Sequence, residues 1–303
     1  MEYRTTGVSL SEYLEVRQKT INSWLERLIP PEDAFPPTIH KSMHYSLMAG
    51  GKRLRPILAL ASSEAVGGDE ETVLPFSCAI EMIHTYSLIH DDLPAMDNDD
   101  LRRGKPTSHK IFGEGIAILA GDALLTHAFI TMSNPEYAKH LDPTVRIMII
   151  HELAKASGTE GMIGGQVLDL EAQNKSLGLD ELSTIHRLKT GCLIRASTKI
   201  GALTAGAEQA DVEALSEYGK HLGLAFQIMD DLLDIEGVEE IIGKTSKSDL
   251  TNHKSTYPAI MGIHKSREKA RESIDKALAA IGHFDHRADA LRQLAHYTIT
   301  REK

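Results

Sequence analysis

Cysteine is scarce in this sequence, and so are aromatic residues. Two cysteines, Cys78 and Cys192, occur among 303 residues, and each lies among apolar and small residues. We therefore expect no disulfide framework, zinc cluster or catalytic thiol, and interpret both as buried structural residues. Aromatic residues make up 5% of the chain, so its elements must pack mainly through Leu, Ile, Ala and Met.

Long apolar runs and basic blocks are also missing. The longest stretch without Asp, Glu, Lys or Arg runs from Ala123 to Pro135, shorter than the roughly 18 apolar residues that span a membrane. The first thirty residues contain acidic side chains such as Glu2 and Glu12 and no apolar signal core. The net charge is −10, without a basic block that could follow a nucleic-acid backbone. We expect a cytoplasmic protein with no membrane span and no nucleic-acid partner.

Helical periodicity dominates what is present. Val145, Ile149 and Leu153 form an apolar stripe, and no convincing run of strands is found. Four of the eleven prolines fall in segment 30–37, which must be a connection after a helix at about 9–28. About ten helices are expected, in one large domain or two medium ones. Further breaks are predicted at Gly67-Gly68, Asn134-Pro135, Gly178 and Gly237.

A first acidic motif, Asp91-Asp92-Leu93-Pro94-Ala95-Met96-Asp97, is expected to end an apolar helix at about 72–90. Pro94 interrupts helical hydrogen bonding. The chain can therefore bulge and bring Asp97 back beside Asp91.

A second motif, Asp230-Asp231-Leu232-Leu233-Asp234, is expected to end a helix at about 211–229. Asp230 and Asp234 are one turn apart on one face, where like charges repel and need compensation. Either motif alone could be a solvated helix end. Two such clusters, each ending an apolar helix, instead predict facing rims of one cavity, whose oxygen ligands suit Mg²⁺ and a bound diphosphate.

Cations accompany these carboxylates. Segment 50–56, Gly-Gly-Lys-Arg-Leu-Arg-Pro, presents three cations beside a diglycine, with Pro56 suited to the first turn of the next helix. Segment 102–106, Arg-Arg-Gly-Lys-Pro, follows the first acidic motif. This alternation suits one diphosphate bridged by metal and a second held by arginine and lysine alone.

Two weaker signals complete the pattern. Gly243-Lys244-Thr245 is not the end of a P-loop, because Gly237 stands one residue too far upstream and no strand precedes it. Lys244 can still reach a diphosphate as a point charge. Segment 165–169, Gly-Gln-Val-Leu-Asp, places an amide and a carboxylate on neighbouring positions of a helix face.

The chain from Lys41 to Pro258 resembles the trans-type isoprenyl diphosphate synthases, and most of all the bacterial farnesyl diphosphate synthases. It carries their ordered motifs GGKRLRP, HDDLPAMDNDDLRRGKPT, GGQVLDL, KTG, FQIMDDLLD, GKTSKSD and KSTYP. The resemblance implies the isoprenoid synthase fold, an all-α single domain over residues 1–303 that forms a large helical bundle around a central cavity. It also implies a homodimer. Departures from the family pattern fall at Val238 and His253.

The same resemblance implies roles for individual residues. Three magnesium ions per active site, bridging the allylic diphosphate, would be bound by Asp91, Asp97, Asp169 and Asp230. The allylic diphosphate would contact Arg102, Lys189, Gln227, Lys244 and Lys254. Isopentenyl diphosphate would be bound by Lys52, Arg55, His84 and Arg103. The developing carbocation would lie near Lys189, Thr190 and Gln227, and product length would depend on Tyr86 and Ser87.

The implied activity is condensation of isopentenyl diphosphate with dimethylallyl or geranyl diphosphate, by magnesium-assisted ionisation, condensation and proton loss. Tyr86, five residues before Asp91, would lie about 7.5 Å deeper along the helix and stop the product at farnesyl diphosphate. A geranylgeranyl diphosphate synthase of the same family is the alternative. A terpene cyclase would not need a second diphosphate pocket, and a catalytically silent subunit would be expected to have lost acidic motifs.

Overall fold

The computed structural model describes residues 9–173, 175–240 and 255–301, with side chains to residue 235 in the middle range. It confirms the predicted all-α class. The helices are α1 (Leu10–Leu28), α2 (Pro37–Leu47), α3 (Leu54–Ala65), α4 (Glu70–Asp91), α5 (Ser108–Phe112), α6 (Glu114–Ser133), α7 (Pro143–Ser157), α8 (Met162–Ala172), α9 (Leu179–His186), α10 (Cys192–Thr204), α11 (Gln209–Glu240), α13 (Tyr257–Met261), α14 (Ile263–Ala280) and α15 (Asp289–Thr300). A π-helical turn, a 3₁₀ turn and two short strands are η1 (Arg187–Gly191), η2 (His286–Ala288), β1 (Leu101–Arg102) and β2 (Lys105–Pro106).

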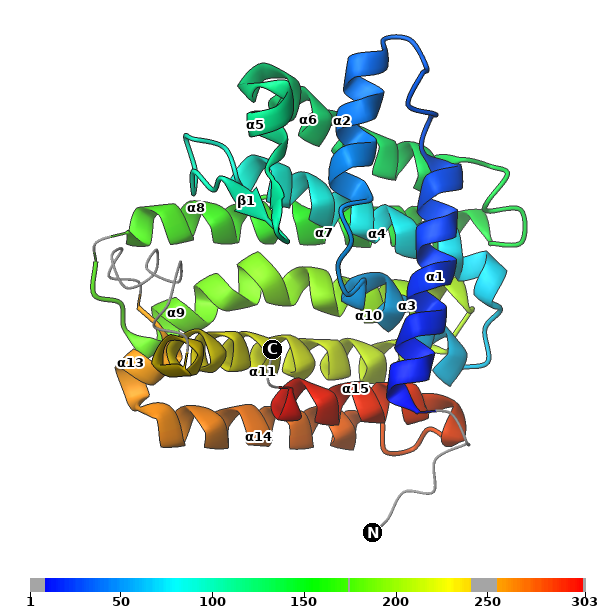
Figure 1. Ribbon diagram of the computed structural model, residues 1–303. Helices are drawn as coiled ribbons and strands as arrows, with labels where there is room; N and C mark the ends of the chain where they lie inside the picture. Colours follow the sequence, from blue (N-terminus) through cyan, green and yellow to red (C-terminus); the bar gives the residue numbers. More distant parts are fainter. Residues whose placement is uncertain (1–8, 174, 241–254, 302–303) are drawn as a thin grey trace.

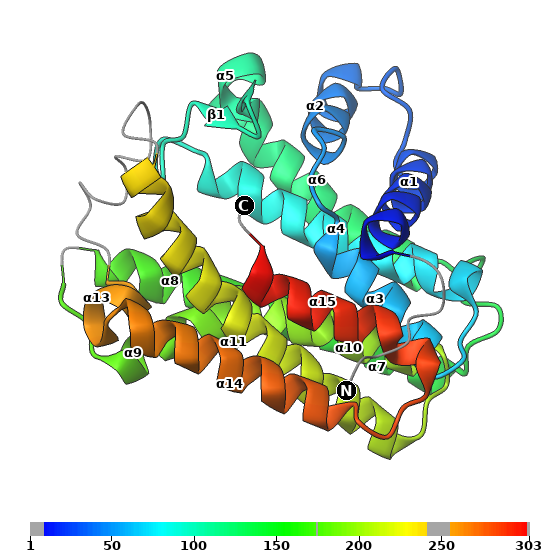
Figure 2. The ribbon, with the colours of Figure 1, turned by 60° about the horizontal axis from the view of Figure 1, so that its bottom comes forward.

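Helices α3, α4 and α10 form the buried centre of the bundle. Helix α10 contacts α3, α4, α7 and α11, while α6 covers α4, and α14 runs along α11 (Figures 1 and 2). Small residues allow these close approaches: a Cβ on Gly201 of α10 would lie 2.1 Å from the carbonyl oxygen of Ala59 in α3. The packing through small and aliphatic side chains agrees with the low aromatic content.

Most predicted helix boundaries are confirmed. Helix α1 begins where Ser9 forms a capping box with Glu12: the Glu12 amide donates to Ser9 Oγ at 3.3 Å, and the Ser9 amide donates to Glu12 Oε2 at 3.0 Å. Segment 30–37 connects α1 to α2, and the breaks predicted at 67–68, 134–135 and 178 lie between helices. Both cysteines are unpaired, but only Cys78 is fully buried; Cys192 is partly exposed.

The end of α11 corrects the sequence prediction. The second acidic motif does not end the helix, because α11 continues through it to Glu240, and Gly237 lies inside the helix. A helical glycine costs about 1 kcal/mol, and packing offsets this cost. Leu232 is buried with Tyr257, and the Tyr257 amide donates to Asp231 Oδ2 at 2.9 Å, which attaches α13 to this part of the helix.

The prediction that the chain contains no strands is also corrected, because the basic segment after the first acidic motif forms a β-hairpin. Strands β1 and β2 are antiparallel, with Arg102 opposite Lys105. Arg103 and Gly104 form its turn with φ of 54° and 75°. Positive φ at both central residues is the geometry of the tightest hairpin turns, and the short strands leave no alternating pattern to recognise.

Two helices, α4 and α6, are long and apolar enough to cross a membrane by length and composition alone. In the most apolar window of α4, 78% of residues are buried inside the protein, as in a core helix. The corresponding window of α6 is 39% buried, so this helix leaves apolar side chains at the surface.

Candidate active site

A cavity of about 400 Å³ lies between α4, α8 and η1. Asp91 and Lys189 mark its polar side, and Arg55 and His84 also line it. Its apolar wall includes Met96, Met162, Ile163, Val167 and Leu170. The structure therefore brings residues from both predicted diphosphate pockets to one apolar space.

The first acidic motif turns back on itself as predicted. After α4 ends, the Asp97 amide donates to the Asp91 carbonyl at 2.9 Å, and the Asn98 amide donates to the Leu93 carbonyl at 3.1 Å. Burial, reinforced by the Asp97 carboxylate, raises the pKa of Asp91 to about 6, although Lys189 and Arg102 oppose the rise. The negative charge of Asp91 is therefore only partly compensated by the protein.

The second motif reaches the same region through a chain of hydrogen bonds. Thr190 Oγ1 donates to Gln227 Oε1 at 3.1 Å, and Gln227 Nε2 donates to Asp230 Oδ2 at 3.1 Å. Burial raises the pKa of Asp230, while Arg301, Arg55 and Lys52 oppose the rise. The sequence predicted that the negative charges of this motif need compensation. The compensating positive charges come from residues outside α11.

Arg301 is the residue here that sequence reasoning missed. It follows α15, pairs directly with Asp230 Oδ1 and lies over the Phe226 ring, 4.1 Å from its centroid. Only 6% of its side chain is exposed. The sequence contains no signal for this contact, because the two partners are 71 positions apart.

Lys189 lies in the π-helical turn η1, where the chain makes one wider turn between α9 and α10. Its ammonium donates to Asp169 Oδ2 on α8 at 2.7 Å. Helix α8 approaches so closely that a Cβ on Gly165 would lie 2.2 Å from the Lys189 backbone nitrogen. The π turn and this glycine together place Lys189 and Thr190 at the cavity.

A separate cluster of cations surrounds His84. Burial, together with Arg55, Arg103, Arg53 and Arg102, lowers the pKa of His84 well below its ordinary value, so the imidazole is neutral at neutral pH. Arg55 is partly buried, and its buried Nε has no hydrogen-bond partner. Lys52, three residues earlier in the sequence, is exposed. Three of the four predicted residues, Arg55, His84 and Arg103, are therefore brought together. Lys52 instead lines a neighbouring pocket with Arg301 and acts on Asp230.

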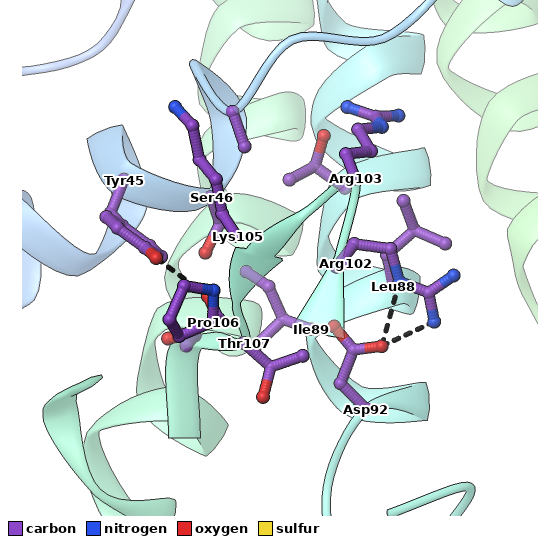
Figure 3. Close-up of a pocket in the computed structure, with 13 residues that line it drawn as sticks. Tyr45, Ser46, Leu88, Ile89, Asp92, Arg102, Arg103, Lys105, Pro106 and Thr107 are labelled. Carbon is purple, nitrogen blue, oxygen red and sulfur yellow. Dashed lines mark hydrogen bonds and ion pairs between the residues drawn. The ribbon is translucent and has the colours of Figure 1, made fainter. Parts of the chain in front are cut away.

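The hairpin separates the two arginines that follow the first motif (Figure 3). Arg102 donates through Nε to Asp92 Oδ1 at 2.9 Å and through Nη2 to Asp99 Oδ2 at 3.2 Å. Arg103 turns away from it and donates to the Gly50 carbonyl. The Tyr45 hydroxyl fixes the second strand by donating to the Pro106 carbonyl at 2.7 Å.

The four predicted metal ligands do not converge into one cluster. In the described ranges, no group of three or more His, Cys, Asp or Glu side chains is arranged to hold a metal ion. Lys189 and Arg301 instead contact oxygens of Asp169 and Asp230. The donor chemistry nonetheless suits Mg²⁺, because the incompletely compensated charge of Asp91, which shares the cavity with Lys189, is one that a cation would stabilise.

Gln166, whose amide the sequence placed on one helix face with Asp169 but gave no role, is a further cavity residue. Its Nε2 and Oε1 are both buried without a hydrogen-bond partner. It lines the cavity beside Lys189 and Thr190. An unpaired buried amide costs free energy, so the position of Gln166 in the cavity wall requires an explanation other than stability.

Tyr86 and Ser87 also line the cavity. Tyr86 is 5% exposed, and its ring meets that of His90 edge to face at 5.8 Å between centroids. The predictions for Lys244, His253 and Lys254 lie outside the described residues, as does the side chain of Val238.

Comparison with known proteins identifies the family of this chain. The model of the polyprenyl synthetase family matches residues 36–295. Farnesyl diphosphate synthase of Geobacillus stearothermophilus is 48% identical over 295 residues, covering 97% of this chain and 99% of that protein. The large subunit 1 of the heterodimeric geranylgeranyl pyrophosphate synthase of Arabidopsis thaliana chloroplasts is 45% identical, covering 96% and 79%.

Solved structures agree with the sequence comparisons. A structure of an FPP/GFPP synthase from Zymomonas mobilis superimposes with a TM-score of 0.86 at 38% identity, covering 96% of this chain and 99% of that one. A putative farnesyl-diphosphate synthase from Marinomonas gives a TM-score of 0.82 at 39% identity, covering 96% and 99%. The resemblance read from the ordered motifs is confirmed, and the chain belongs to the polyprenyl synthetase family.

Proposed function

We propose that this protein is a magnesium-dependent prenyltransferase that condenses isopentenyl diphosphate with dimethylallyl or geranyl diphosphate and releases farnesyl diphosphate. The observation that carries this proposal is the convergence of Asp91, Lys189, Arg55 and His84 on one apolar cavity. Such a cavity accommodates an isoprenoid tail and two diphosphates at its polar side. Residues 1–303 are proposed to form one functional domain.

The residues divide into an allylic side and an isopentenyl side. On the allylic side, Lys189 and Arg102 lie near Asp91, and their positive charges can stabilise the diphosphate as it departs. On the other side, Arg55 and Arg103 lie near the neutral imidazole of His84, and can bind a diphosphate without metal.

Three magnesium ions are proposed for Asp91, Asp97, Asp169 and Asp230. When bound, magnesium supplies electrophilic assistance to cleavage of the allylic carbon–oxygen bond. Lys189 and Arg301 contact two of these aspartates, so their side chains must share or yield those oxygens to a metal.

The cavity walls can protect a carbocation. The Thr190 hydroxyl, the Gln227 carboxamide and the unpaired Gln166 carboxamide lie on the polar side, where their dipoles can stabilise positive charge. Met162, Val167 and other apolar residues line the rest and exclude water. Proton loss completes the condensation, with the released diphosphate as the base.

Tyr86 supports farnesyl diphosphate as the product, because a bulky buried ring lines the cavity five residues from Asp91. A geranylgeranyl product is the second candidate, since relatives named for each product have similar identities of 48% and 45%. A terpene cyclase is disfavoured by the separate cation cluster. A silent subunit is disfavoured by the completeness of both acidic motifs.

We also propose a cytoplasmic homodimer formed through α6 and α7. These neighbouring helices expose Leu119 and Ile130 on α6, and Ile147 and Met148 on α7. Contiguous exposed apolar side chains mark interaction surfaces. A second copy is the proposed occupant, because an isologous interface uses one patch twice, and the Arabidopsis relative is itself named as a subunit of a heterodimer.

The activity is tested by incubating the protein with labelled isopentenyl diphosphate and each allylic primer, dimethylallyl, geranyl or farnesyl diphosphate, with and without Mg²⁺. Products are dephosphorylated and separated by chromatography. We expect farnesol from the first two primers with magnesium and no product without it. Geranylgeraniol as the main product would assign the second candidate, and cyclic hydrocarbons would refute prenyl transfer.

A further inference from the structure

Arg53 is buried at the start of α3 and holds several elements together. It is 2% exposed. Its guanidinium donates to three elements: from Nε to Asn22 Oδ1 on α1 at 2.9 Å, from Nη2 to the Leu47 carbonyl on α2 at 2.6 Å, and from Nη1 to Glu81 Oε1 on α4 at 2.8 Å. The Arg53–Glu81 ion pair is almost completely buried, with side-chain exposures of 1% and 2%.

The backbone at this point is in an unfavourable conformation. Arg53 has φ of 52°, after Gly50 at 92° and Gly51 at 118°. Glycine adopts such angles readily, whereas a side-chain-bearing residue does so only when its surroundings hold it there. The three hydrogen bonds of the Arg53 guanidinium supply this restraint.

The restrained loop carries the predicted isopentenyl diphosphate residues. Lys52 precedes Arg53, and Arg55 lies two residues after it in the first turn of α3. Arg103 arrives from the hairpin and donates to the Gly50 carbonyl, and a Cβ on Gly51 would lie 2.4 Å from its guanidinium carbon. The positions of all three cations therefore depend on the course of residues 50–53.

Glu81 supplies the counter-charge for this cluster. It pairs with Arg53, and its negative charge also acts on Arg55 and Arg103, opposing the lowering of their pKa by burial. Without a carboxylate, the clustered cations would repel one another. Glu81 lies three residues before His84 on α4, so the helix that presents the imidazole also anchors the loop.

We propose that the buried Arg53–Glu81 pair is the positioning unit of the isopentenyl diphosphate pocket. It does not touch substrate, but fixes the loop that carries Lys52, leads into Arg55 and accepts the hydrogen bond of Arg103. This inference rests on the proposed function. It predicts that loss of the pair raises KM for one of the two substrates selectively. A purely stabilising ion pair would not produce this selectivity.

The test is the double variant Arg53→Met/Glu81→Met, which removes the pair and leaves the net charge of the pocket unchanged. Single variants leave one uncompensated buried charge and should lower Tm more than the double variant. In the double variant we expect KM for isopentenyl diphosphate to rise at least tenfold. KM for geranyl diphosphate should stay within about twofold of the original.

A control is Arg17→Met/Glu64→Met, which removes a less buried ion pair between α1 and α3 outside the pocket and also the contact of Arg17 with Glu70. It should leave both KM values within about twofold. Should Arg53→Met/Glu81→Met fail to fold, Arg53→Lys is judged by the same criterion, because an ammonium can pair with Glu81 but cannot reproduce the three-way contact of the guanidinium.

Equal rises in both KM values, or a lower Tm with both KM values unchanged, would overturn the positioning role. Failure of the unaltered protein to consume isopentenyl diphosphate with any primer would instead refute the proposed function. The two failures are therefore distinguishable.

Discussion

Individual aspartates of the site are compensated in different ways. Asp169 contacts the Lys189 ammonium at 2.7 Å, and Asp230 pairs with Arg301. Asp91 receives only longer-range help from Lys189 and Arg102, and its pKa is raised to about 6. A bound cation is therefore stabilised most strongly at Asp91, the aspartate whose negative charge the protein itself compensates least.

Tyr86→Ala tests the residue proposed to limit product length. Removing the buried ring enlarges the cavity, so we expect geranylgeranyl diphosphate and longer products under excess isopentenyl diphosphate. Chromatography of dephosphorylated products measures the change. Tyr86→Phe keeps the bulk of the ring and should still give farnesyl diphosphate. An active Tyr86→Ala enzyme that still stops at farnesyl diphosphate would show that another residue sets the length.

Gln166→Met separates a functional role from a structural one. A buried amide without partners costs about 1–3 kcal/mol, so methionine, similar in shape but less polar, should raise Tm. Loss of the proposed dipole should lower kcat by about 10²-fold. Thermal denaturation and steady-state kinetics measure both effects. Gln173→Met, at the exposed end of α8, is the control, and a lower Tm with normal kcat would identify Gln166 as structural.

At the scale of elements, α8 and η1 act as a pair, because their contact positions the backbone of Lys189 and Thr190, which are proposed to act in catalysis. Gly165 allows α8 to reach η1: its added Cβ would overlap the backbone of Leu188 and Lys189. The hydrogen bond from the Lys189 ammonium to Asp169 on α8 also links the two elements.

Gly165→Ala is therefore expected to displace Lys189 and Thr190 and to lower kcat/KM by about 10²-fold. Overpacking should also reduce the free energy of unfolding by about 1–3 kcal/mol. Steady-state kinetics and denaturant titration measure the two effects. Gly115→Ala on α6, where a Cβ meets no atom within 4 Å, should keep full activity. Normal kinetics in Gly165→Ala would show that the close approach is not required.

At the scale of the whole molecule, the exposed apolar side chains of α6 and α7 form the proposed dimer surface. Ile147 is 66% exposed on α7, and Ile147→Asp would bury a charge in the proposed dimer interface. We expect a monomer by analytical ultracentrifugation at concentrations where the unaltered protein is a dimer. Val16→Asp on α1, at a position 57% exposed, should remain dimeric. A dimeric Ile147→Asp protein would place the interface elsewhere.

The sequence alone was sufficient for the fold class, most helix boundaries and the family, because these depend on local periodicity and on ordered motifs. It also predicted the return of Asp97 to Asp91, since Pro94 acts within one turn. It failed at α11, where packing of Leu232 and Tyr257 outweighs a helical glycine, and at the hairpin, whose two-residue strands carry no pattern.

Tertiary structure alone decided which distant groups meet. The pairing of Arg301 with Asp230, the three-way contact of Arg53 and the approach of Gly165 to η1 join residues far apart in the chain or on separate elements. Such contacts depend on how helices pack, and helix packing leaves no periodic signal at the individual polar residue. The residues that make up the site were thus predictable from local sequence. The partners that balance their charges and the contacts that position them arise only when the helices pack.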